Sequence, residues 1–275
     1  MTPVEETVIE AGRPGRRYLQ DLWRYRELFL FLAWRDLLVR YKQTVVGVGW
    51  SVIRPCLTMV ILTVVFGNLG SMPSGGVPYP LLVLCGLLPW QFFATALSDS
   101  GNSLVSNSGL ISKVYFPRLI IPAGGVIIGL VDFLISLSLL VALMIWYHWV
   151  PPATIALAPL FVLLAMATSF GAGTWAAALT IKYRDFRVII PFVVQFGLYI
   201  SPVGFLSSIV PENYRLLYSL NPMVGVIDGF RWSILGGQHA LSLQSLAFSF
   251  IGTLSLLITG MWYFRKAERT FADVI

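Results

Sequence analysis

Long apolar stretches alternate with short polar segments along most of the chain, and few charged residues fall inside the apolar stretches. A helix needs roughly 20 apolar residues to cross the hydrocarbon core of a bilayer, because each residue adds about 1.5 Å. We therefore expect an all-α, polytopic membrane protein with six transmembrane helices. They lie at about 45–66, 80–97, 119–147, 154–181, 188–205 and 241–264. The first residues, to about 27, hold no apolar core, so we expect no cleavable signal peptide.

The segment 206–240 is too short to cross a bilayer twice and too apolar for an ordinary loop. Pro211, the Asn221-Pro222 pair and Gly236-Gly237 predict two short helices with a break at the Asn-Pro. Short helices that return to the same side form a re-entrant external hairpin, which is tolerated at membrane depth only where protein or a cavity surrounds it. The segment is a candidate gate or pore mouth, and a cap that merely shields the bundle is the alternative.

Residues 18–38 carry apolar side chains on one helical face, in a part of the chain too polar to cross a bilayer. The apolar positions are Leu22, Tyr25, Phe29 and Leu32. Trp23 and Trp34 are candidate anchors, and Asp36 and Arg40 are spaced for an ion pair within one helix. The pattern predicts an N-terminal amphipathic helix in the membrane interface. This helix is either a plain anchor or a docking surface for a partner.

The polar segment before the third stretch ends in a short run of aromatic and basic residues. A helix in this segment would end at Phe116, because Pro117 disfavours helical backbone in the residue before it. Exposed Lys113, Tyr115, Phe116 and Arg118 would give the segment the composition of a protein contact. A solvated turn with one apolar face under the bundle is the alternative.

Composition excludes the soluble globular and disordered classes. The 275 residues are 57% hydrophobic and 12% charged, with a mean hydropathy of +0.78. Soluble domains are roughly 45–50% apolar and about 25% charged, and disordered chains are poor in apolar and aromatic residues. We expect one transmembrane domain over 1–275, with an N-terminal segment 1–44, a six-span bundle 45–264 and a tail 265–275.

The basic residues are distributed unevenly between the two sides of the expected bundle. Of the 19 Lys and Arg residues, 17 lie on one side of the expected bundle: before or at the start of the first span, after the second, after the fourth, or after the last. Only Arg215 and Arg231 lie on the other side. Because Lys and Arg concentrate in cytoplasmic loops, both termini are expected in the cytoplasm. Topology explains the net charge of +6, and no nucleic acid partner is expected.

No residue pattern indicates catalysis by the chain itself. A phosphate-binding loop ends in Gly-Lys followed by Ser or Thr, and no Gly-Lys pair occurs. His148 and His239 lie far apart with no carboxylate or thiol cluster, and Cys56 and Cys85 form no disulfide framework. We therefore expect no catalytic residue, cofactor or metal in this chain, and any ATP-derived energy must come from a partner.

Asp132 is the only carboxylate well inside a predicted span. An Asp at the centre of a membrane helix costs about 2.5–3.5 kcal/mol on insertion scales, so it must face protein, water or a hydrogen-bond partner. We favour a structural role, either protonated or bonded to a Ser or Thr of a neighbouring helix, over contact with a substrate.

Aromatic residues make up 14% of the chain and are the candidate lining of a substrate path. Conduction needs weak contacts at many sites, and aromatic rings offer such contacts without demanding one hydrogen-bond pattern. The candidates are Trp90, Phe92, Phe93, Tyr199, Phe205, Tyr214, Tyr218, Phe230 and Trp232. Most other rings are expected in the interfacial belts of the membrane.

Small residues cluster in two of the stretches, at Gly124-Gly125 with Gly129 and at Gly171-Ala172-Gly173. Small residues let membrane helices approach closely. We expect these positions at helix contacts, inside the bundle or across a dimer.

Several runs together resemble the permease subunits of bacterial polysaccharide ABC transporters, within the type-two ABC exporters. The runs are Trp-Arg-Tyr-Arg-Glu-Leu at 23–28, Trp-Arg-Asp to Val-Arg-Tyr-Lys-Gln-Thr at 34–44, Gly-Val-Gly-Trp at 47–50 with Pro55, Lys-Val-Tyr-Phe-Pro-Arg at 113–118, Tyr-Arg-Asp-Phe at 183–186, Tyr218 with Asn-Pro-Met at 221–223, and the tail 264–275. The resemblance covers nearly the whole chain in order. It points to the O-antigen and capsule exporters, and the teichoic acid exporters are also similar.

This resemblance implies a homodimer that associates with two copies of a separate ATPase subunit, which would bind ATP and Mg²⁺. The implied ATPase-docking residues are Trp23, Arg24, Arg26, Glu27, Lys113, Tyr115, Phe116 and Arg118. Residues 206–237 would correspond to periplasmic gate helices. The implied cargo is a lipid-linked polysaccharide that crosses the bacterial inner membrane from cytoplasm to periplasm, as in O-antigen export for lipopolysaccharide biosynthesis.

Two other functions are compatible with six spans. A type-two ABC exporter of drugs or small lipids would have a narrow cleft in place of a wide aromatic channel. An integral-membrane enzyme of glycan assembly would need clustered charges at one face, where the external side offers Glu212, Arg215, Asp228 and Arg231. Asp228 and Arg231 are spaced to pair with one another.

Overall fold

The computed structural model describes residues 15–42, 47–236, 241–268 and 271, and all regular structure within them is helical. The α-helices are α1 (Gly15–Arg24), α2 (Arg26–Lys42), α3 (Trp50–Leu62), α4 (Tyr79–Ser106), α5 (Ser108–Ile111), α6 (Ile120–Trp146), α7 (Ala158–Lys182), α8 (Phe186–Ile200), α9 (Glu212–Ser219), α10 (Pro222–Leu235) and α11 (Leu243–Glu268). The π-helix Thr63–Leu69 continues α3, and short 3-10 helices occupy Gly47–Gly49, Ala153–Leu157 and Ser207–Ile209. His239, Gly237 and the tail positions other than 265–268 and 271 lie outside the described residues.

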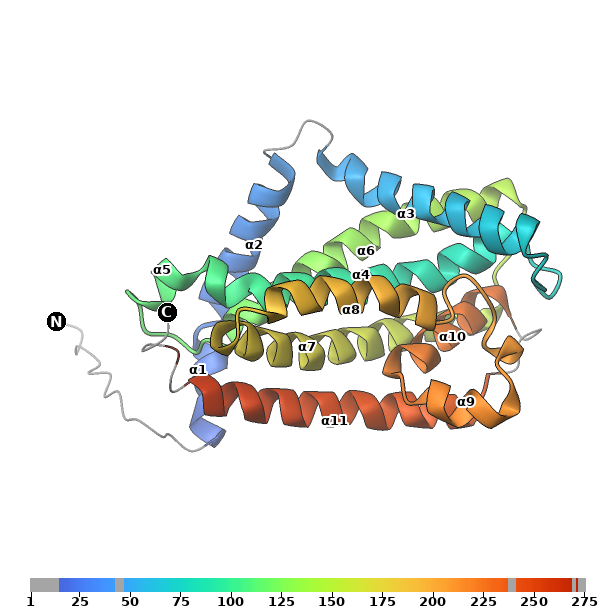
Figure 1. Cartoon of the computed structure of the whole chain (residues 1–275). Helices are drawn as coiled ribbons and strands as arrows, with labels where there is room; N and C mark the ends of the chain where they lie inside the picture. The colour runs from blue at the N-terminus through green and yellow to red at the C-terminus, as the bar shows by residue number, and fades with distance from the viewer. Residues whose placement is uncertain (1–14, 43–46, 237–240, 269–270, 272–275) are drawn as a thin grey trace.

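The long helices run roughly side by side, so the bundle has two ends (Figure 1). The α5 end carries α1, α5 and the first turns of α6, and the α9 end carries α9, α10 and the connection between α3 and α4 (Figure 1). These two names are used for the ends below.

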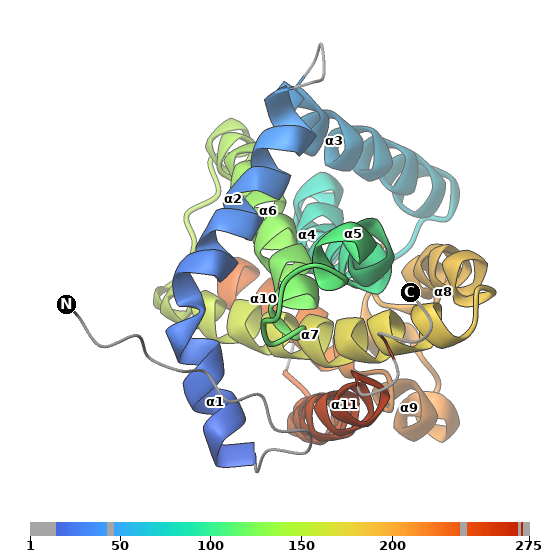
Figure 2. The ribbon, with the colours of Figure 1, turned by 90° about the vertical axis from the view of Figure 1, so that its left-hand side faces the viewer.

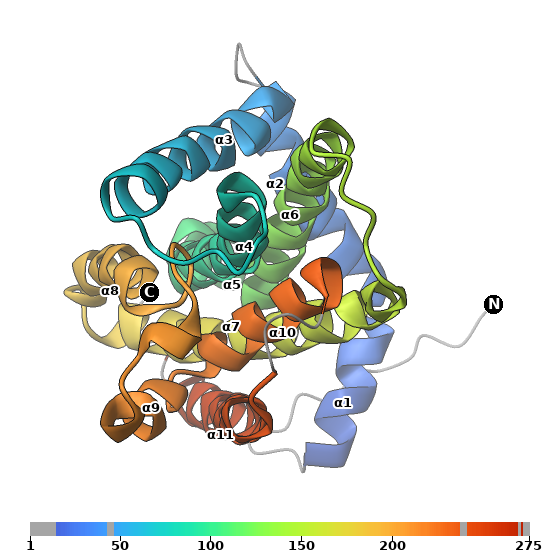
Figure 3. The same cartoon turned by 90° about the vertical axis from the view of Figure 1, so that its right-hand side faces the viewer.

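Helix α4 forms the centre of the bundle. Figures 2 and 3 look along the bundle from its two ends and show α3, α6, α7, α8 and α10 around it. In the most apolar window of α4, 78% of the residues are buried, and side chains such as Leu81, Leu84 and Leu88 are enclosed. A helix covered on all sides needs an apolar surface on all sides. The unbroken apolar run at the start of α4 provides this surface.

Five helical segments are long and apolar enough to cross a membrane, and they match five of the six predicted spans. They are Gly47–Leu69, Tyr79–Ser106, Ile120–Trp146, Ala153–Lys182 and Leu243–Glu268. The remaining predicted span, 188–205, overlaps α8 (Phe186–Ile200), which has only 15 residues. Fifteen residues measure about 22 Å, which is less than the roughly 30 Å of a bilayer core. The difference arises because the chain leaves the helix at Ser201, whose backbone is extended.

The predicted helix at 18–38 is two helices, because α1 ends at Arg24 and α2 begins at Arg26 (Figure 2). The predicted apolar positions face inward: Leu22, Tyr25, Phe29 and Leu32 pack at the α5 end against a cluster formed by α4, α6, α7 and α11. Trp23 and Trp34 lie on the outside. The amphipathic pattern therefore grouped these residues on one face, but that face packs on the bundle, whereas the sequence predicted that it lies in the membrane interface.

The predicted helix ending at Phe116 is shorter than expected. Helix α5 ends at Ile111, and the backbone from Lys113 to Phe116 is not helical. Phe116 is also not exposed, since only 3% of its surface is accessible and it packs into the cluster at the α5 end. Burial of the phenylalanine ring stabilises this non-helical path, and Pro117 disfavours helical backbone at Phe116.

The two short helices expected between the last two spans are α9 and α10. The chain breaks at Asn221, whose side chain accepts a hydrogen bond of 3.0 Å from the backbone N–H of Met223 and so caps α10. Helix α10 ends at Leu235, and the next residue, Gly236, has a φ of +82°, which favours glycine. The two helices differ in burial, because α9 is mostly exposed while α10 packs against α4, α7 and α11. Helix α10 is therefore part of the bundle core.

Candidate functional site

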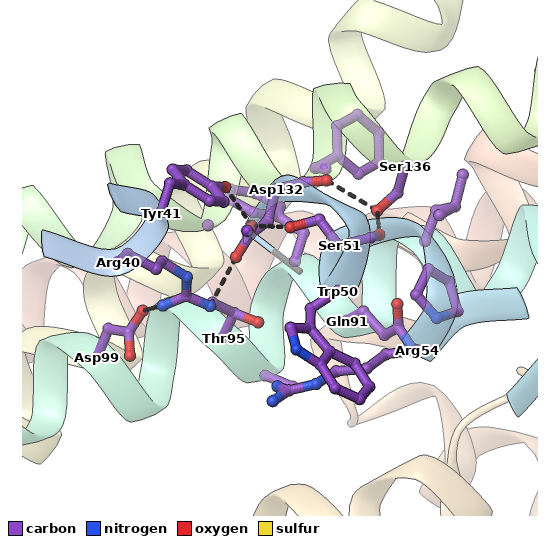
Figure 4. A pocket seen from close by; sticks show the side chains of 17 residues that line it. Arg40, Tyr41, Trp50, Ser51, Arg54, Gln91, Thr95, Asp99, Asp132 and Ser136 are labelled. Atoms are coloured by element: carbon purple, nitrogen blue, oxygen red, sulfur yellow. Dashed lines mark hydrogen bonds and ion pairs between the residues drawn. The ribbon is translucent and has the colours of Figure 1, made fainter. Parts of the chain in front are cut away.

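A network of charged and hydroxyl side chains joins the end of α2 to three long helices. The guanidinium of Arg40 donates to the carboxylates of Asp99 on α4 and Asp132 on α6, at 2.8 and 2.7 Å. Asp132 also accepts hydrogen bonds from the hydroxyls of Tyr41, at 2.5 Å, and Ser51 on α3, at 2.6 Å (Figure 4). We call these five residues the Arg40 cluster.

The Arg40 cluster explains how a carboxylate is accommodated inside a membrane helix. Ser51 supplies the hydroxyl partner that was expected for Asp132. Arg40 and Tyr41 are further partners, and no periodic pattern indicated them because 90 or more positions separate them from Asp132. Arg40 bonds in this cluster and not to Asp36, which pairs with Arg35 at 2.6 Å. The expected Asp36–Arg40 pair is thus replaced by tertiary contacts.

The proton of Tyr41 is held firmly in this cluster. Burial raises the pKa of Tyr41 to about 12, and the hydrogen bond to Asp132 acts in the same direction. Both effects disfavour the phenolate, since a buried anion beside a carboxylate is doubly unfavourable. Tyr41 is therefore a permanent donor to Asp132.

A cavity of about 550 Å³ opens beside the Arg40 cluster, between α2, α3, α4 and α6 (Figure 4). Its wall includes polar side chains from each long helix, among them Arg54 on α3, Gln91 and Thr95 on α4, and Ser136 on α6. Trp50, Phe92 and Phe133 supply the aromatic part of the wall. The volume lies within the roughly 300–1,000 Å³ typical of ligand sites.

The predicted docking residues lie at the α5 end, in two groups. Trp23, Arg24, Arg26 and Glu27 are exposed on α1 and α2, with the guanidinium of Arg26 5.4 Å from the Trp23 ring centre. In the second group, Lys113 and Tyr115 are exposed beside a hollow of about 340 Å³.

Phe116 and Arg118 belong to the packing of the α5 end. Phe116 is buried. The backbone N–H of Arg118 donates to the Glu268 carboxylate at 3.0 Å, and its guanidinium donates to the Glu268 carbonyl at 2.9 Å. The same guanidinium lies 5.8 Å from the centre of the Phe271 ring. These contacts attach the start of α6 to the end of α11.

The nine candidate lining aromatics differ in burial. Trp90, Phe92 and Phe230 are buried in the bundle, and Phe133 links the last two at ring distances of 5.9 and 5.8 Å. Phe93, Phe205, Tyr218 and Trp232 are partly buried, whereas Tyr199 and Tyr214 are exposed. Trp90, Phe92 and Phe230 therefore contribute to packing inside the bundle, and Phe92 also lines the cavity.

The most enclosed charge in the structure is one that the sequence placed on the external face. Arg231 on α10 is 1% exposed and donates to the backbone carbonyls of Leu82, Pro202, Val203 and Phe205, at 2.6 to 3.2 Å. The expected pairing with Asp228 exists but is looser, at 3.7 Å. Only the tertiary structure brings these carbonyls together, so no local signal indicates this role.

The remaining candidate chemistry is sparse in the described residues. Glu212 and Arg215 form a separate exposed pair at 3.5 Å, apart from the Asp228–Arg231 pair. Cys56 and Cys85 are free thiols. No group of three metal-ligating side chains occurs within the part of the chain that the structure describes.

Comparison with known proteins adds a family relationship. The family model described as ABC-2 type transporter matches residues 27–235. The chain is 26% identical over 250 residues to the O-antigen export system permease protein RfbA of Klebsiella pneumoniae, covering 90% of this chain and 95% of the relative. RfbA of Myxococcus xanthus is 29% identical over 219 residues, covering 78% and 83%. The polysialic acid transport protein KpsM of Escherichia coli is 24% identical over 247 residues, covering 87% and 92%.

Proposed function

The chain belongs to the ABC-2 type transporter family, and from this premise we propose that it is the permease subunit of an ATP-driven exporter of a lipid-linked, O-antigen-like polysaccharide. The observation that carries the proposal is the alignment with an O-antigen export permease over 90% of this chain and 95% of that relative. Polysialic acid transport, named for a second relative, is also movement of a polysaccharide.

Energy for transport would come from a separate ATPase subunit that binds ATP and Mg²⁺. Two copies of the permease would form a homodimer and bind two copies of the ATPase. The exposed side chains of Trp23, Arg26, Lys113 and Tyr115 at the α5 end are suited to this contact, because aromatic and basic residues dominate protein hot spots. Phe116 and Arg118 would support the contact by fixing the loop.

The α5 end would face the cytoplasm, with both chain termini on that side of a bacterial inner membrane. The basic residues Lys113, Lys182, Arg184 and Arg265 all lie at this end of the bundle, which the positive-inside rule assigns to the cytoplasm. Helix α8 would complete a six-span bundle together with the extended residues that follow it. Helices α9 and α10 would then form the periplasmic gate region, and α1 and α2 would lie in the cytoplasmic interface.

The Arg40 cluster would carry the movement of the ATPase into the bundle. Binding of ATP closes the ATPase subunits, and α1 and α2 would move with them. Arg40 donates hydrogen bonds directly to side chains on α4 and α6, and Asp132 of α6 accepts a hydrogen bond from the Ser51 hydroxyl on α3. A displacement of α2 therefore acts on three spanning helices at once through short hydrogen bonds.

The proposal is tested by deleting the gene in its own organism and measuring surface polysaccharide by gel and immunoblot. We expect surface glycan to disappear, lipid-linked glycan to accumulate in the cytoplasmic leaflet, and both to recover with the wild-type gene. The purified chain should retain a phosphate-loop ATPase on an affinity column, and Tyr115→Ala should weaken this retention while Tyr199→Ala, a control at an exposed ring, should not. Unchanged surface glycan together with altered drug resistance would favour the small-molecule exporter instead.

A further inference from the structure

The cavity beside the Arg40 cluster is polar at a depth where membrane proteins are normally apolar. Gln91 lies 12 residues after the start of α4 and 15 before its end, which places it about 18 and 22 Å from the two ends. Thr95 and Asp99 follow on the same face of α4, and all three line the cavity. Polar side chains inside a membrane face protein, water or a ligand path. This wall of α4 is therefore suited to a polar ligand.

Arg54 is the cation of the cavity that remains available. The guanidinium of Arg40 is engaged by two carboxylates, Asp99 and Asp132. Arg54 lies 5.8 Å from the Trp50 ring centre, and within the described residues no carboxylate lies close enough to form an ion pair with it. A guanidinium on a membrane helix without a carboxylate is suited to an oxyanion such as phosphate, because its planar fork can donate two parallel hydrogen bonds to two phosphate oxygens.

The start of α3 adds positive potential at the same place. Gly47, Trp50 and Ser51, which begin this helical segment, all line the cavity. The first turn of a helix presents backbone N–H groups without helical partners, and the helix dipole places roughly half a positive charge there. Arg54 lies one turn further along the same helix, so both positive features meet at one wall of the cavity.

A stripe of exposed apolar side chains continues from Arg54 along α3. Leu57 and Ile61 follow at three and seven residues, which is the spacing of one helical face. They are 57% and 60% exposed, and Val64 continues the stripe into the π-helix. A cation at the head of an apolar stripe matches a ligand with an anionic head and a hydrocarbon chain.

We propose that this cavity binds the phosphate headgroup of a polyprenyl-phosphate-linked lipid from the leaflet at the α5 end, with Arg54 as the anion ligand and the Leu57–Ile61 face as the seat of the hydrocarbon chain. The proposal rests on the proposed function, in which the cargo is lipid-linked, and it locates where the lipid is first held. Trp50 and Gln91 flank the headgroup, and Arg40, neutralised by Asp99 and Asp132, shapes the rear wall.

Binding is measured by native mass spectrometry of the full-length permease–ATPase complex with geranylgeranyl diphosphate as the probe. We expect Arg54→Gln to weaken binding at least about tenfold, as expected for the loss of a charge-assisted hydrogen bond. Arg54→Lys, which keeps the charge without the bidentate geometry, should retain intermediate affinity. Arg184→Gln is the matched control, an exposed arginine at the same end of the bundle outside the cavity, and should bind as wild type.

Three results would overturn the proposal: equal binding by Arg54→Gln and wild type, equal retention of geranylgeraniol and the diphosphate, or equal weakening by Arg184→Gln. Phosphatidylglycerol is added as a competitor at the same mole fraction as geranylgeranyl diphosphate. If the two lipids bind equally well, the ligand of the cavity is a bulk phospholipid and not a polyprenyl carrier. Surface glycan measured in the same variants separates the two proposals. If the diphosphate binds in an Arg54-dependent way but surface glycan does not depend on this chain, the proposed lipid site would stand and the proposed export function would be refuted.

Discussion

Two charged side chains inside this bundle, those of Asp132 and Arg231, form hydrogen bonds with partners that lie far away in the sequence. Asp132 is bonded by Arg40, Tyr41 and Ser51, and Arg231 is bonded by four backbone carbonyls. A polar group in an apolar surrounding costs several kcal/mol unless it is paired. The hydrogen bonds of these residues therefore connect different helices. Removing one partner leaves the other polar group buried without a hydrogen bond, which is unfavourable.

The Arg40–Asp132 ion pair is expected to be energetically coupled. We expect Arg40→Gln and Asp132→Asn each to lower the free energy of unfolding by about 1–3 kcal/mol, because each leaves an opposite charge without its partner and both side chains keep some solvent contact. The double variant should lose less than the sum by about 0.5–3 kcal/mol. The measurement is denaturant unfolding in detergent micelles. Asp185→Asn, at an exposed carboxylate, is the control, and strictly additive losses would contradict the coupling.

Arg231 is expected to be the least replaceable cation. Arg231→Gln removes at least two of the bonds to Leu82, Pro202, Val203 and Phe205, and the carbonyls left behind are buried. We expect the free energy of unfolding to fall by about 3–5 kcal/mol, in the range of a broken buried pair. Arg215→Gln, which removes an exposed pair, should cost about 1 kcal/mol or less. Equal thermal midpoints for the two variants would show that the buried bonds carry no net stability.

At the scale of elements, close approach of α4 to its neighbours determines which glycines are needed. A Cβ on Gly125 of α6 would lie 2.6 Å from the backbone nitrogen of Ser100 on α4, and one on Gly86 of α4 would lie 2.4 Å from the Arg231 guanidinium. No atom lies within 4 Å of a Cβ placed on Gly124, the residue before Gly125. The sequence indicated that this pair of glycines belongs to a helix contact, and the structure distinguishes between them.

The neighbouring glycines on α6 give a matched pair of variants. Gly125→Ala should destabilise the protein by about 1–3 kcal/mol, because α4 backbone must move to admit the methyl group. Gly124→Ala should be neutral or stabilising by up to about 1 kcal/mol, since alanine has the higher helix propensity and meets no neighbour. Thermal unfolding of the two variants in the same detergent makes the comparison, and a reversed order would refute the α4–α6 packing.

On the scale of the whole molecule, the bundle exposes a broad apolar surface on α3, α8 and α11. Leu57, Val188, Phe250 and Trp262 are all more than half exposed. An apolar surface of this size on a soluble protein would promote association, whereas a bilayer or a second copy covers it. The two ends differ in charge, and this difference underlies the proposed orientation.

The orientation is tested by labelling single cysteines with a membrane-impermeant maleimide. Glu212→Cys on α9, whose side chain is 86% exposed, should react from the periplasmic side of intact spheroplasts. Arg184→Cys, between α7 and α8, should react only after the membrane is opened. The unsubstituted chain, with its free Cys56 and Cys85, sets the background. Labelling of Arg184→Cys in intact spheroplasts would invert the proposed topology.

The sequence by itself determined the class of the molecule. A helical membrane protein is specified by runs of about 20 apolar residues, by few charged residues, and by basic residues concentrated on one side of the bundle. These local features are sufficient because the energy of placing backbone and charge in lipid depends on local composition. The same local logic predicted the break at Asn221, where a capping side chain precedes Pro222. It also placed Leu22, Phe29 and Leu32 on one apolar face, but the packing of that face on the bundle was not predicted.

Only the tertiary structure decided which polar groups meet. Arg40 and Asp132 are 92 positions apart, and Arg231 and Leu82 are 149 apart, so no helical period relates them. The same holds for Phe116, which the sequence placed outside and the packing of the α5 end buried. Local sequence patterns indicate how favourable it is, in free energy, to place each segment in lipid or in water. The choice of partner depends on how the helices pack, and the cavity at Arg54 exists only once α2, α3, α4 and α6 are assembled.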